Sequence, residues 1–434
     1  MLIQFTVSNY KTFAEETKIS LVASKDSKYR DTNVFDSNFK YDLLKTTVIY
    51  GANASGKTKF FEALDFMKKN IFNSANYQST KKINATPFRL NTQKINEPSL
   101  FELIFIENNI MYRYGFEITT EKVVSEWLFM RQNNSRPKEI ELFYREGQEF
   151  EFHSTKFKIK DLIENNRIKT NSLLLSIADA NNVEYATKVF NWVARKLKII
   201  SGLKMDNYLA YTVRELENDI KKRNILNFLK EADLDIIDLL PKTSNISDLP
   251  KQLQEIIANN KGSEEYEVFS DVITSKKQYN ENNSFVGLEE FSMDNDESSG
   301  TRKYFALATP ILDVLQKGLV LFVDELDASL HPNLTKKIIE LFHSKETNPK
   351  NAQLIFNTHN TNLLNPNSKL FRRDQIWFVK KDHYGAASLY SLADFKTDEV
   401  RKEDNYEKDY IAGQYGAIPY LGDFETLKNR ENGN

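Results

Sequence analysis

The sequence predicts an α/β fold with an N-terminal antiparallel β subdomain and an inserted helical lobe. Residues 46–70 show a β-branched run, a glycine loop and then apolar residues at helical spacing, which predicts strand, loop and helix. Residues 319–323 form a continuous apolar run, which is typical of a buried parallel strand. Alternating apolar residues in the first 150 positions favour a separate sheet.

The N-terminal part is expected to consist mainly of strands outside the glycine loop. Alternation or compact apolar runs predict strands at residues 2–7, 19–22, 101–106, 110–118, 127–130 and 140–144. Asn108-Asn109 separates the third from the fourth, so these two are expected to form a hairpin.

The middle of the chain has a different composition. Residues 160–260 are polar and lysine-rich with apolar stripes at helical spacing, so we expect mostly helices there. Residues 260–297 carry Gly, Ser, Asn and acids, and we expect little regular structure in them. Residues 150–290 together are interpreted as an inserted helical lobe.

Strong α/β patterns return near residue 300. A helix is expected over residues 301–316, with Pro310 kinking or dividing it. The remaining elements are a strand at 319–323, a helix at 335–344, a strand at 353–357 and a terminal hairpin of 375–379 with 388–391.

Composition excludes several classes of chemistry. The 434 residues include no cysteine, which excludes disulfides, Cys-based zinc sites and a Cys nucleophile. The five histidines are not paired at the spacing of a helical metal site. A net charge of -2, from 59 basic and 61 acidic residues, shows no overall bias toward nucleic acid or membrane. We see no signal peptide and no membrane-spanning run, so a cytoplasmic protein without membrane contact is expected.

The glycine loop between the predicted strand and helix matches the Walker A pattern completely. The residues expected to bind ATP there are Gly51, Asn53, Ala54, Ser55, Gly56, Lys57 and Thr58. Glycines let the backbone N–H groups face a phosphate, and the helix N-terminus adds positive potential. Lys57 would reach the β- and γ-phosphates, and the Thr58 hydroxyl would bind Mg²⁺. An ordinary Gly-Ser turn is the alternative, but the strand and helix on either side favour the phosphate loop.

The apolar run 319–323 ends in two acids, as a Walker B strand does. Asp324 would hold Mg²⁺ through water, and Glu325 would polarise the attacking water. On its own such a strand could equally run into a solvated acidic turn. The phosphate loop elsewhere in the chain favours the nucleotide interpretation.

Three further features follow in a recognisable order. A serine-glycine stretch, Ser298, Ser299, Gly300 and Thr301, opens the helix before the Walker B strand and would form a second anion cradle. Asp327 lies in the turn just after the two acids, and His359 follows the strand 353–357. A histidine at that strand end could contact a γ-phosphate. A capped helix, a turn and a loop histidine are the alternatives, which the combined order disfavours.

This order of motifs resembles the ATP-binding-cassette (ABC) ATPases. The opening residues 5–13 resemble the soluble branch that contains RecF, SMC-like and OLD-type ATPases. Residues 360–364, 372–378 and 415–419 resemble the class-15 AAA subgroup of stand-alone bacterial ATPases. The resemblance covers 1–130 and 290–425, while the middle carries no recognisable motif.

The resemblance implies an ABC-type P-loop ATPase that forms a head-to-head dimer or higher oligomer. In such dimers the signature Ser298–Thr301 contacts the γ-phosphate in trans, and Asp327 organises the interface. Glu325 would be the catalytic base, His359 the switch residue, and Lys11 would approach the nucleotide from the N-terminal strands. The signature departs from Leu-Ser-Gly-Gly-Gln, because Glu297, Ser299 and Thr301 replace its Leu, first Gly and Gln. No Q-loop glutamine can be assigned.

The resemblance also implies how the length is divided. Residues 1–150 would be the N-terminal half of one split ATPase domain, 151–297 an inserted helical lobe and linker, and 298–434 the C-terminal half. ATP and Mg²⁺ are the expected cofactors.

Members of this subgroup often belong to bacterial anti-phage defence systems, as a sensor or scaffold beside a separately encoded effector such as a TOPRIM-type nuclease. We therefore expect a protein effector and a phage-encoded trigger as partners. Two Asp-x-Asp pairs, at 233–235 and 294–296, have the spacing of a two-metal nuclease, but solvated acids are the better interpretation. No further effector motif is found.

Two alternatives remain. A RecF- or SMC-like DNA-repair ATPase could use the short basic runs 221–223, 276–277 and 372–373 to bind duplex DNA, although the overall charge does not indicate it and a solvated surface is preferred. The other alternative is a scaffold that uses ATP only to assemble.

Overall fold

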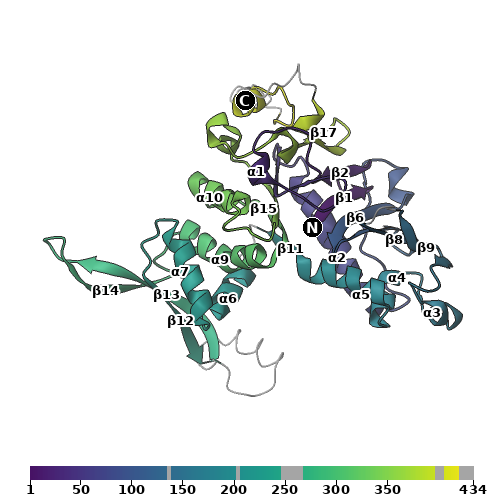
Figure 1. Cartoon of the computed structure of the whole chain (residues 1–434), viewed down its shortest axis with the longest axis horizontal. Coiled ribbons are helices and arrows are strands. Elements are labelled where there is room, and N and C mark those ends of the chain that lie inside the picture. Colours follow the sequence, from purple (N-terminus) through teal and green to yellow (C-terminus); the bar gives the residue numbers. More distant parts are fainter. Residues whose placement is uncertain (134–137, 202–205, 246–266, 396–404, 420–434) are drawn as a thin grey trace, which may run out of the picture. The chain divides into compact units, whose positions relative to one another are not determined.

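The structure is a computed structural model that describes residues 1–133, 138–201, 206–245, 267–395 and 405–419 (Figure 1). It contains two compact units. Unit 1 comprises Met1–Ile199, Val320–Asp324 and Gln353–Asn434, and unit 2 comprises Ile200–Leu319 and Glu325–Ala352. The units are defined by packing alone, so the division predicted from the sequence (1–150, 151–297, 298–434) stays a prediction.

The first sheet of unit 1, called the N-terminal sheet, has the order β10-β9-β8-β7-β6-β1-β2 among the described residues. Its strands are β1 (Leu2–Ser8), β2 (Thr17–Ser20), β6 (Ser99–Glu107), β7 (Ile110–Ile118), β8 (Val123–Gln132), β9 (Ile140–Glu146) and β10 (Glu149–Phe152). Every neighbouring pair is antiparallel, which confirms the predicted N-terminal β subdomain and its 101–118 hairpin.

The second sheet of unit 1, called the central sheet, has the order β11-β15-β16-β5-β17-β18 in the described part of the chain. Its strands are β5 (Thr46–Gly51), β11 (Leu197–Ser201), β15 (Val320–Asp324), β16 (Gln353–Asn357), β17 (Ile376–Lys381) and β18 (Ala387–Ser391). The four strands β15-β16-β5-β17 run parallel, and β18 is antiparallel to β17. The carboxyl ends of β15, β16 and β5 therefore meet at one edge, where ligands bind in open α/β sheets.

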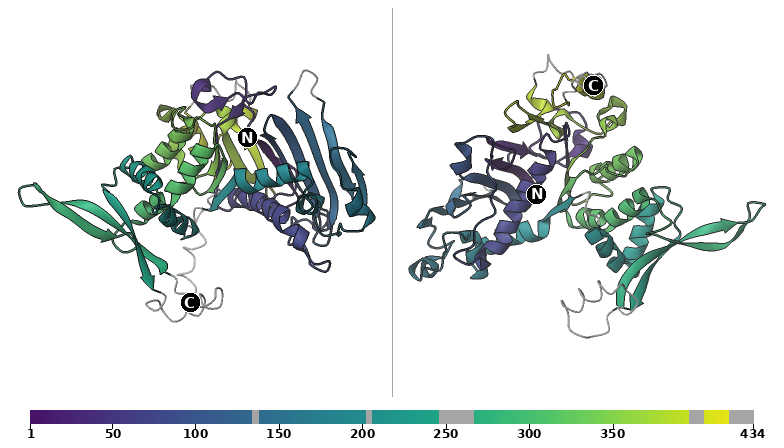
Figure 2. Two further views of the ribbon diagram at one scale, coloured as in Figure 1. Left: turned by 60° about the horizontal axis from the view of Figure 1, so that its bottom comes forward. Right: turned by 180° about the vertical axis from the view of Figure 1, so that it is seen from behind.

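Helix α2 (Lys57–Asn73) packs against both sheets of unit 1. Its Phe60 ring contacts Phe5 of β1 at a centroid distance of 5.3 Å, and its Phe61 ring contacts Phe322 of β15 at 5.7 Å. Side chains from α2 and both sheets form one buried apolar cluster. Figure 2 shows α2 running along the N-terminal sheet. This packing holds the start of the helix, and the glycine loop before it, in a fixed place.

The smaller elements of unit 1 lie around this core. They are α1 (Arg30–Asn33), the strand pair β3 (Val34–Phe35) and β4 (Leu43–Leu44), α3 (Lys160–Glu164), α4 (Leu174–Ala180), α5 (Glu184–Asn191) and α11 (Tyr406–Ile411). None of the helices that the structure describes, in either unit, is long and apolar enough to cross a membrane.

Unit 2 combines helices with a small sheet. Its helices are α6 (Asp206–Glu215), α7 (Asp219–Lys230), α9 (Ser299–Lys317) and α10 (Pro332–His343), as far as the structure describes it. Helix α9 is the centre of the packing: Tyr304 stacks on Phe228 of α7 at 4.5 Å, and the Thr212 hydroxyl of α6 donates to the Ala306 carbonyl at 3.1 Å. Pro310 lies inside α9 without dividing it, so the expected division was wrong, and the expected kink stays a prediction.

The antiparallel sheet of unit 2 was not predicted. Its described strands, in the order β12-β13-β14, are β12 (Asp238–Asn245), β13 (Glu267–Tyr279) and β14 (Phe285–Ser292). The expectation of little regular structure over residues 260–297 was therefore wrong for residues 267–292, while residues 260–266 lie outside the described part of the chain. In Figure 1 the β13–β14 hairpin extends beyond the helices of its own unit. Its exposed charged and apolar residues have no period that marks one buried face, which explains why the pattern gave no strand signal.

Candidate functional site

The glycine loop joins β5 to α2 in unit 1, as the sequence predicts. A Cβ atom on Gly51 would lie 2.5 Å from the Val379 carbonyl oxygen, so only glycine allows this close approach. Gly56 has a φ of 117° and Ala54 a φ of 60°, which bend the loop into the start of the helix. The helix begins at Lys57, directly after Gly56, which has no side chain to cap its first N–H groups. The loop is therefore shaped as an anion cradle.

The side chains of the loop suit a phosphate group. The Lys57 ammonium is buried inside the loop and donates to the carbonyls of Gly51 at 2.6 Å and Ala52 at 3.1 Å. The Ser55 hydroxyl is buried and has no hydrogen-bond partner among the described residues. A buried hydroxyl beside a buried ammonium is costly without an acceptor, and a phosphate oxygen would supply one. Asn53 lies on the same loop.

The two predicted Mg²⁺ ligands are in contact. The Thr58 hydroxyl, in the first turn of α2, donates to Asp324 Oδ1 at 3.1 Å. The Asn357 amide donates to the same oxygen at 2.5 Å. Asp324 ends β15 and Asn357 ends the neighbouring strand β16, so the sheet register brings them together. A hydroxyl and a carboxylate are the oxygen donors that Mg²⁺ prefers, so these residues fit that ion.

Asn357 is a site residue that the sequence reasoning missed. It is fully buried and orients Asp324 from the next strand. The only sequence signal is a polar residue at the end of the apolar strand Gln353–Asn357. That signal has meaning only once β16 is known to lie beside β15.

His359 follows β16 in unit 1, two residues after Asn357. The backbone around it is held by two hydrogen bonds: the Thr358 N–H donates to the Ile49 carbonyl at 3.3 Å, and the Tyr50 hydroxyl donates to the Asn360 carbonyl at 3.0 Å. His359 therefore belongs to the same sheet edge as the glycine loop and Asp324. Its contact with a γ-phosphate stays a prediction.

Lys11 lies near the glycine loop but has a protein partner. Its ammonium forms an ion pair with Glu62 of α2 at 2.5 Å, and Glu62 also binds Lys59 at 2.8 Å. Burial raises the pKa of Glu62, but the hydrogen bonds from both lysines outweigh it and lower the pKa overall. The neighbouring Thr12 hydroxyl oxygen would lie 3.0 Å from a Cβ at Gly56. The predicted ATP contact of Lys11 stays a prediction.

The predicted signature opens α9 in unit 2. Ser298 is the N-cap: its hydroxyl oxygen accepts from the Thr301 N–H at 3.0 Å and lies 2.9 Å from the Thr301 hydroxyl. Ser299 and Gly300 form the first turn. A Cβ at Gly300 would lie 2.8 Å from the Ser329 carbonyl oxygen, so the turn carrying Asp327 packs directly on the signature helix. The signature glycine is therefore required by this close contact.

The same unit fixes the backbone of the predicted catalytic base. Glu325 has a φ of 58°, and its carbonyl accepts from the Lys303 ammonium of α9 at 3.1 Å. Burial lowers the pKa of Lys303 to about 8, against the opposing effect of Asp327 and Glu325. An open cleft of about 930 Å³ in unit 2 is lined by the signature residues together with Ser329, His331 and Lys337.

The structure thus gathers the predicted residues in two groups. Within unit 1 it brings together the glycine loop, Lys57, Thr58, Asp324 and His359 at one edge of the central sheet. Within unit 2 it joins the signature to the turn of Asp327 and to the backbone of Glu325. The roles assigned to these residues stay predictions.

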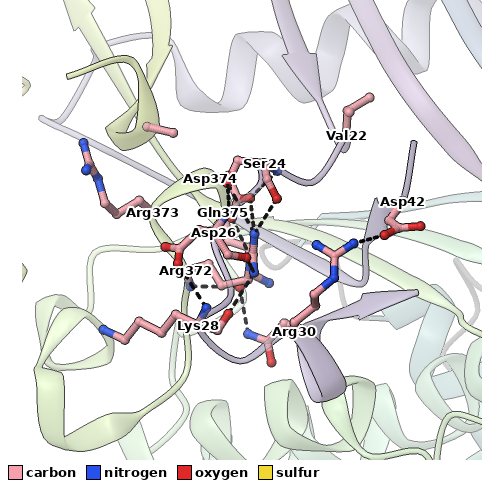
Figure 3. A network of polar contacts seen from close by, with 12 residues as sticks. Val22, Ser24, Asp26, Lys28, Arg30, Asp42, Arg372, Arg373, Asp374 and Gln375 are labelled. Carbon is pink, nitrogen blue, oxygen red and sulfur yellow. Dashed lines mark hydrogen bonds and ion pairs between the residues drawn. The ribbon is translucent and has the colours of Figure 1, made fainter. Parts of the chain in front are cut away.

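Arg372 and Arg373 do not form a basic surface. Arg372 is fully buried, and its guanidinium donates to the Asp374 carboxylate at 2.9 and 2.8 Å and to the carbonyls of Asp26 and Lys28 at 2.6 and 2.8 Å (Figure 3). Arg373 donates to two carbonyls of residues 392–395. Both the DNA face and the solvated surface considered for this pair are wrong for Arg372, which ties the loop of residues 24–28 to the segment just before β17.

The Asp-x-Asp pair at 294–296 has ordinary contacts. Asp294 forms an ion pair with Arg302 at 3.1 Å, and Asp296 accepts from the Ser292 N–H at 2.7 Å. The residues that the structure describes include no group of three or more Asp, Glu or His side chains that could hold a metal ion.

Comparison with known proteins places this site in a family. The model of the family described as "AAA domain, putative AbiEii toxin, Type IV TA system" matches residues 46–365, which is more than half of the chain. A search of curated proteins gave no match. The matched residues 46–365 include the two predicted Walker motifs, the predicted signature and His359.

The solved structures that are similar to this chain have low sequence identity to it. The SMC head domain from Thermotoga maritima is 14% identical, with 90% of this chain and 98% of that chain covered and a TM-score of 0.39. The recombination mediator protein RecF of the RecFOR pathway, with ATPrS, is 14% identical, with coverage of 90% and 98% and a TM-score of 0.30. The cbiO1 protein from Clostridium perfringens, part of an ABC transporter complex, is 11% identical, with coverage of 88% and 92% and a TM-score of 0.30.

Proposed function

Because the chain belongs to the AAA-domain family whose model it matches, we propose that it hydrolyses ATP with Mg²⁺ to ADP and phosphate. The observation that carries the proposal is the 3.1 Å hydrogen bond from the Thr58 hydroxyl to Asp324, which joins residues from two separate motifs. Lys57 would bind the β- and γ-phosphates, and Thr58 with Asp324 would hold Mg²⁺. Glu325 would polarise the attacking water and His359 would contact the γ-phosphate.

A phosphate-release assay tests this proposal. Glu325→Gln keeps the size of the side chain but removes the base, so it should bind ATP and release phosphate at least 100-fold more slowly, roughly the loss expected for a general base. Lys57→Ala should lose ATP binding itself. Glu346→Gln is the matched control, because Glu346 is an exposed acid of the same unit outside the site. A wild-type rate no higher than that of Glu325→Gln would contradict the proposal.

We also propose that the active form is a head-to-head dimer or higher oligomer of this chain. The N-terminus of α9, capped by Ser298, opens on the cleft of unit 2 and offers N–H groups to an anion. In the oligomer, Ser298 and Gly300 of one copy would contact the γ-phosphate held by Lys57 of another, and Asp327 would lie at the interface. The resemblance to ABC-type ATPases supports this arrangement.

At the level of the cell, we infer a sensor or scaffold of a bacterial anti-phage defence system, acting on a separately encoded effector such as a TOPRIM-type nuclease. The motifs of the class-15 AAA subgroup and the toxin–antitoxin wording of the family description support this inference. The effector should co-purify with the chain in the presence of ATP, and Glu325→Gln should change both this association and protection against phage. Co-purification of no neighbouring gene product, together with unchanged phage sensitivity, would contradict it.

The DNA-repair alternative has less support in the structure. The basic residues 221–223 and 276–277 of unit 2 include lysines that are paired with acids: Lys222 with Asp238 at 2.7 Å and Lys276 with Glu297 at 2.7 Å. Paired lysines release fewer counterions from a duplex than unpaired ones. Salt-dependent duplex binding that stimulates phosphate release would favour the alternative.

A further inference from the structure

The C-terminal helix α11 and the turn after it contain a motif, residues 415–419, that no part of the proposed mechanism uses. The turn is tightly bent, with a φ of 65° at Gly416 and 58° at Ala417. Tyr410 of α11 packs on the rings of Tyr50 and Phe378, at centroid distances of 5.6 and 5.3 Å. Tyr50 directly precedes the glycine loop, so the motif lies against the start of the candidate site in unit 1.

The Tyr410 side chain connects this turn to the strand that leads into the glycine loop. Its hydroxyl donates to the Ala417 carbonyl at 3.2 Å, and its ring packs on Tyr50, the residue before Gly51. Burial raises the pKa of Tyr410 to about 12, against the opposing effect of the Gly51 N–H, so the phenol keeps its proton at neutral pH and can donate this bond. The Gly51 carbonyl in turn accepts from the Lys57 ammonium at 2.6 Å.

Glu407, one turn earlier on α11, holds the other side of the site. Its carboxylate accepts from the Asn365 amide at 2.8 Å and from the Thr361 hydroxyl at 3.4 Å. Thr361 and Asn365 lie in the short segment that follows His359. The Tyr50 hydroxyl holds the same segment through the Asn360 carbonyl at 3.0 Å.

We propose that α11 is a clasp that positions both sides of the nucleotide site. Tyr410 acts through Tyr50, which leads into Gly51 and the loop that carries Lys57, and Glu407 acts through the segment that follows His359. This inference rests on the proposed ATPase function. Tyr410 and Glu407 are positioning residues, because they act through other groups and need not contact the nucleotide.

The two residues should give different kinetic signatures. The glycine loop and Lys57 would bind the β-phosphate, which ATP and ADP share. Tyr410→Phe removes the hydroxyl that fixes the Tyr410 ring beside Tyr50, so it should weaken the binding of both nucleotides by about fivefold, the effect of one net hydrogen bond. His359 is expected to act only on the γ-phosphate. Glu407→Ala should therefore lower kcat by about fivefold and leave the Kd of ADP unchanged, with Glu407→Gln in between because its amide oxygen keeps one acceptor.

The test combines calorimetric titration with Mg-ADP, steady-state phosphate release and thermal melting. Tyr114→Phe is the matched control: its phenol is buried and donates to Glu126 at 3.0 Å, but it belongs to the N-terminal sheet. A raised ADP Kd in Tyr410→Phe and a lowered kcat in Glu407→Ala, neither of which appears in Tyr114→Phe, are the expected results.

Two other outcomes distinguish a failure of the clasp proposal from a failure of the proposed ATPase function. If the wild type hydrolyses ATP and both α11 variants behave as Tyr114→Phe does, the clasp is refuted while the ATPase function stands. If the wild type binds ADP without hydrolysing ATP, the ATPase function fails, and the ADP affinity of Tyr410→Phe still decides the Tyr410 link.

Discussion

Asp324 shows at the scale of single residues how a site can depend on strand order. Its Oδ1 atom accepts from Thr58 of α2 and from Asn357 of β16, so two donors from different elements fix one carboxylate. The orientation of a carboxylate that binds a metal ion helps to set the affinity for that ion. Asn357 would not contact the ion itself. A substitution of Asn357 therefore tests how the orientation of Asp324 affects Mg²⁺ binding without removing a metal ligand.

Asn357→Ala should raise the Mg²⁺ concentration needed for half-maximal phosphate release by about 10- to 100-fold, as loss of an outer-shell partner typically does. A Mg²⁺ titration of the ATPase rate measures this. Asn362→Ala is the control, since Asn362 is exposed and lies in the segment just beyond His359. An unchanged Mg²⁺ dependence in Asn357→Ala would show that Asp324 is oriented without it.

Gly300 is a second single position with a strict requirement. Gly300→Ala would place a Cβ 2.8 Å from the Ser329 carbonyl, and it should lower the unfolding free energy of the protein by about 1–3 kcal/mol, as overpacking does. Gly287→Ala is the control, because a Cβ there meets nothing within 4 Å. Thermal melting of both variants measures the difference, and equal melting temperatures would contradict the close packing of signature and turn.

At the scale of elements, α9 is joined to the turn after β15 by a buried cation. Lys303 of α9 donates to the carbonyl of Glu325, a residue in the left-handed region. Burial lowers the pKa of Lys303 to about 8, whereas an unfolded lysine has a pKa near 10.5. The folded protein therefore binds fewer protons than the unfolded chain between these values, and stability from this group rises as the pH rises from about 8.

This linkage gives a pH-dependent prediction. Lys303→Met removes the titrating group. The wild-type melting temperature minus that of the variant should therefore increase as the pH rises from 7.5 to 9.5. The same comparison below pH 7 should show a constant difference, because Lys303 is then protonated in both states. A wild-type-minus-variant difference that falls above pH 8 would contradict a buried, weakened ammonium at this position.

At the scale of the whole molecule, local patterns predicted most of the fold. The N-terminal strands, the loop of residues 51–58, the Walker B strand and the terminal hairpin all follow from periodicity and motif over short windows, and the structure confirms them as elements. The α/β P-loop fold with an N-terminal antiparallel sheet is likewise confirmed. Each of these signals is contained in a few consecutive residues.

Other features depend on contacts between distant parts of the chain. Asn357 gains its role from a neighbouring strand, and Arg372 is buried because the carbonyls of residues 24–28 surround its guanidinium. Strand β14 is largely exposed, so burial imposed no alternation on its sequence. Such features cannot be predicted without the tertiary structure.

The central claim is that ATP is hydrolysed at a site shared by two copies of the chain. Lys57→Ala removes the phosphate-binding lysine, and Ser298→Asp keeps the N-cap of α9 but places a negative charge where the γ-phosphate would lie. Ser298→Asn, a neutral residue that also caps, is the control and should retain activity.

Phosphate release by an equal mixture of Lys57→Ala and Ser298→Asp tests this claim most directly. Each variant alone should be inactive. In a dimer, half of the mixed molecules would pair the two variants and carry one intact site, so the mixture should recover roughly a quarter of the wild-type rate. A mixture as inactive as its two components would contradict the shared site.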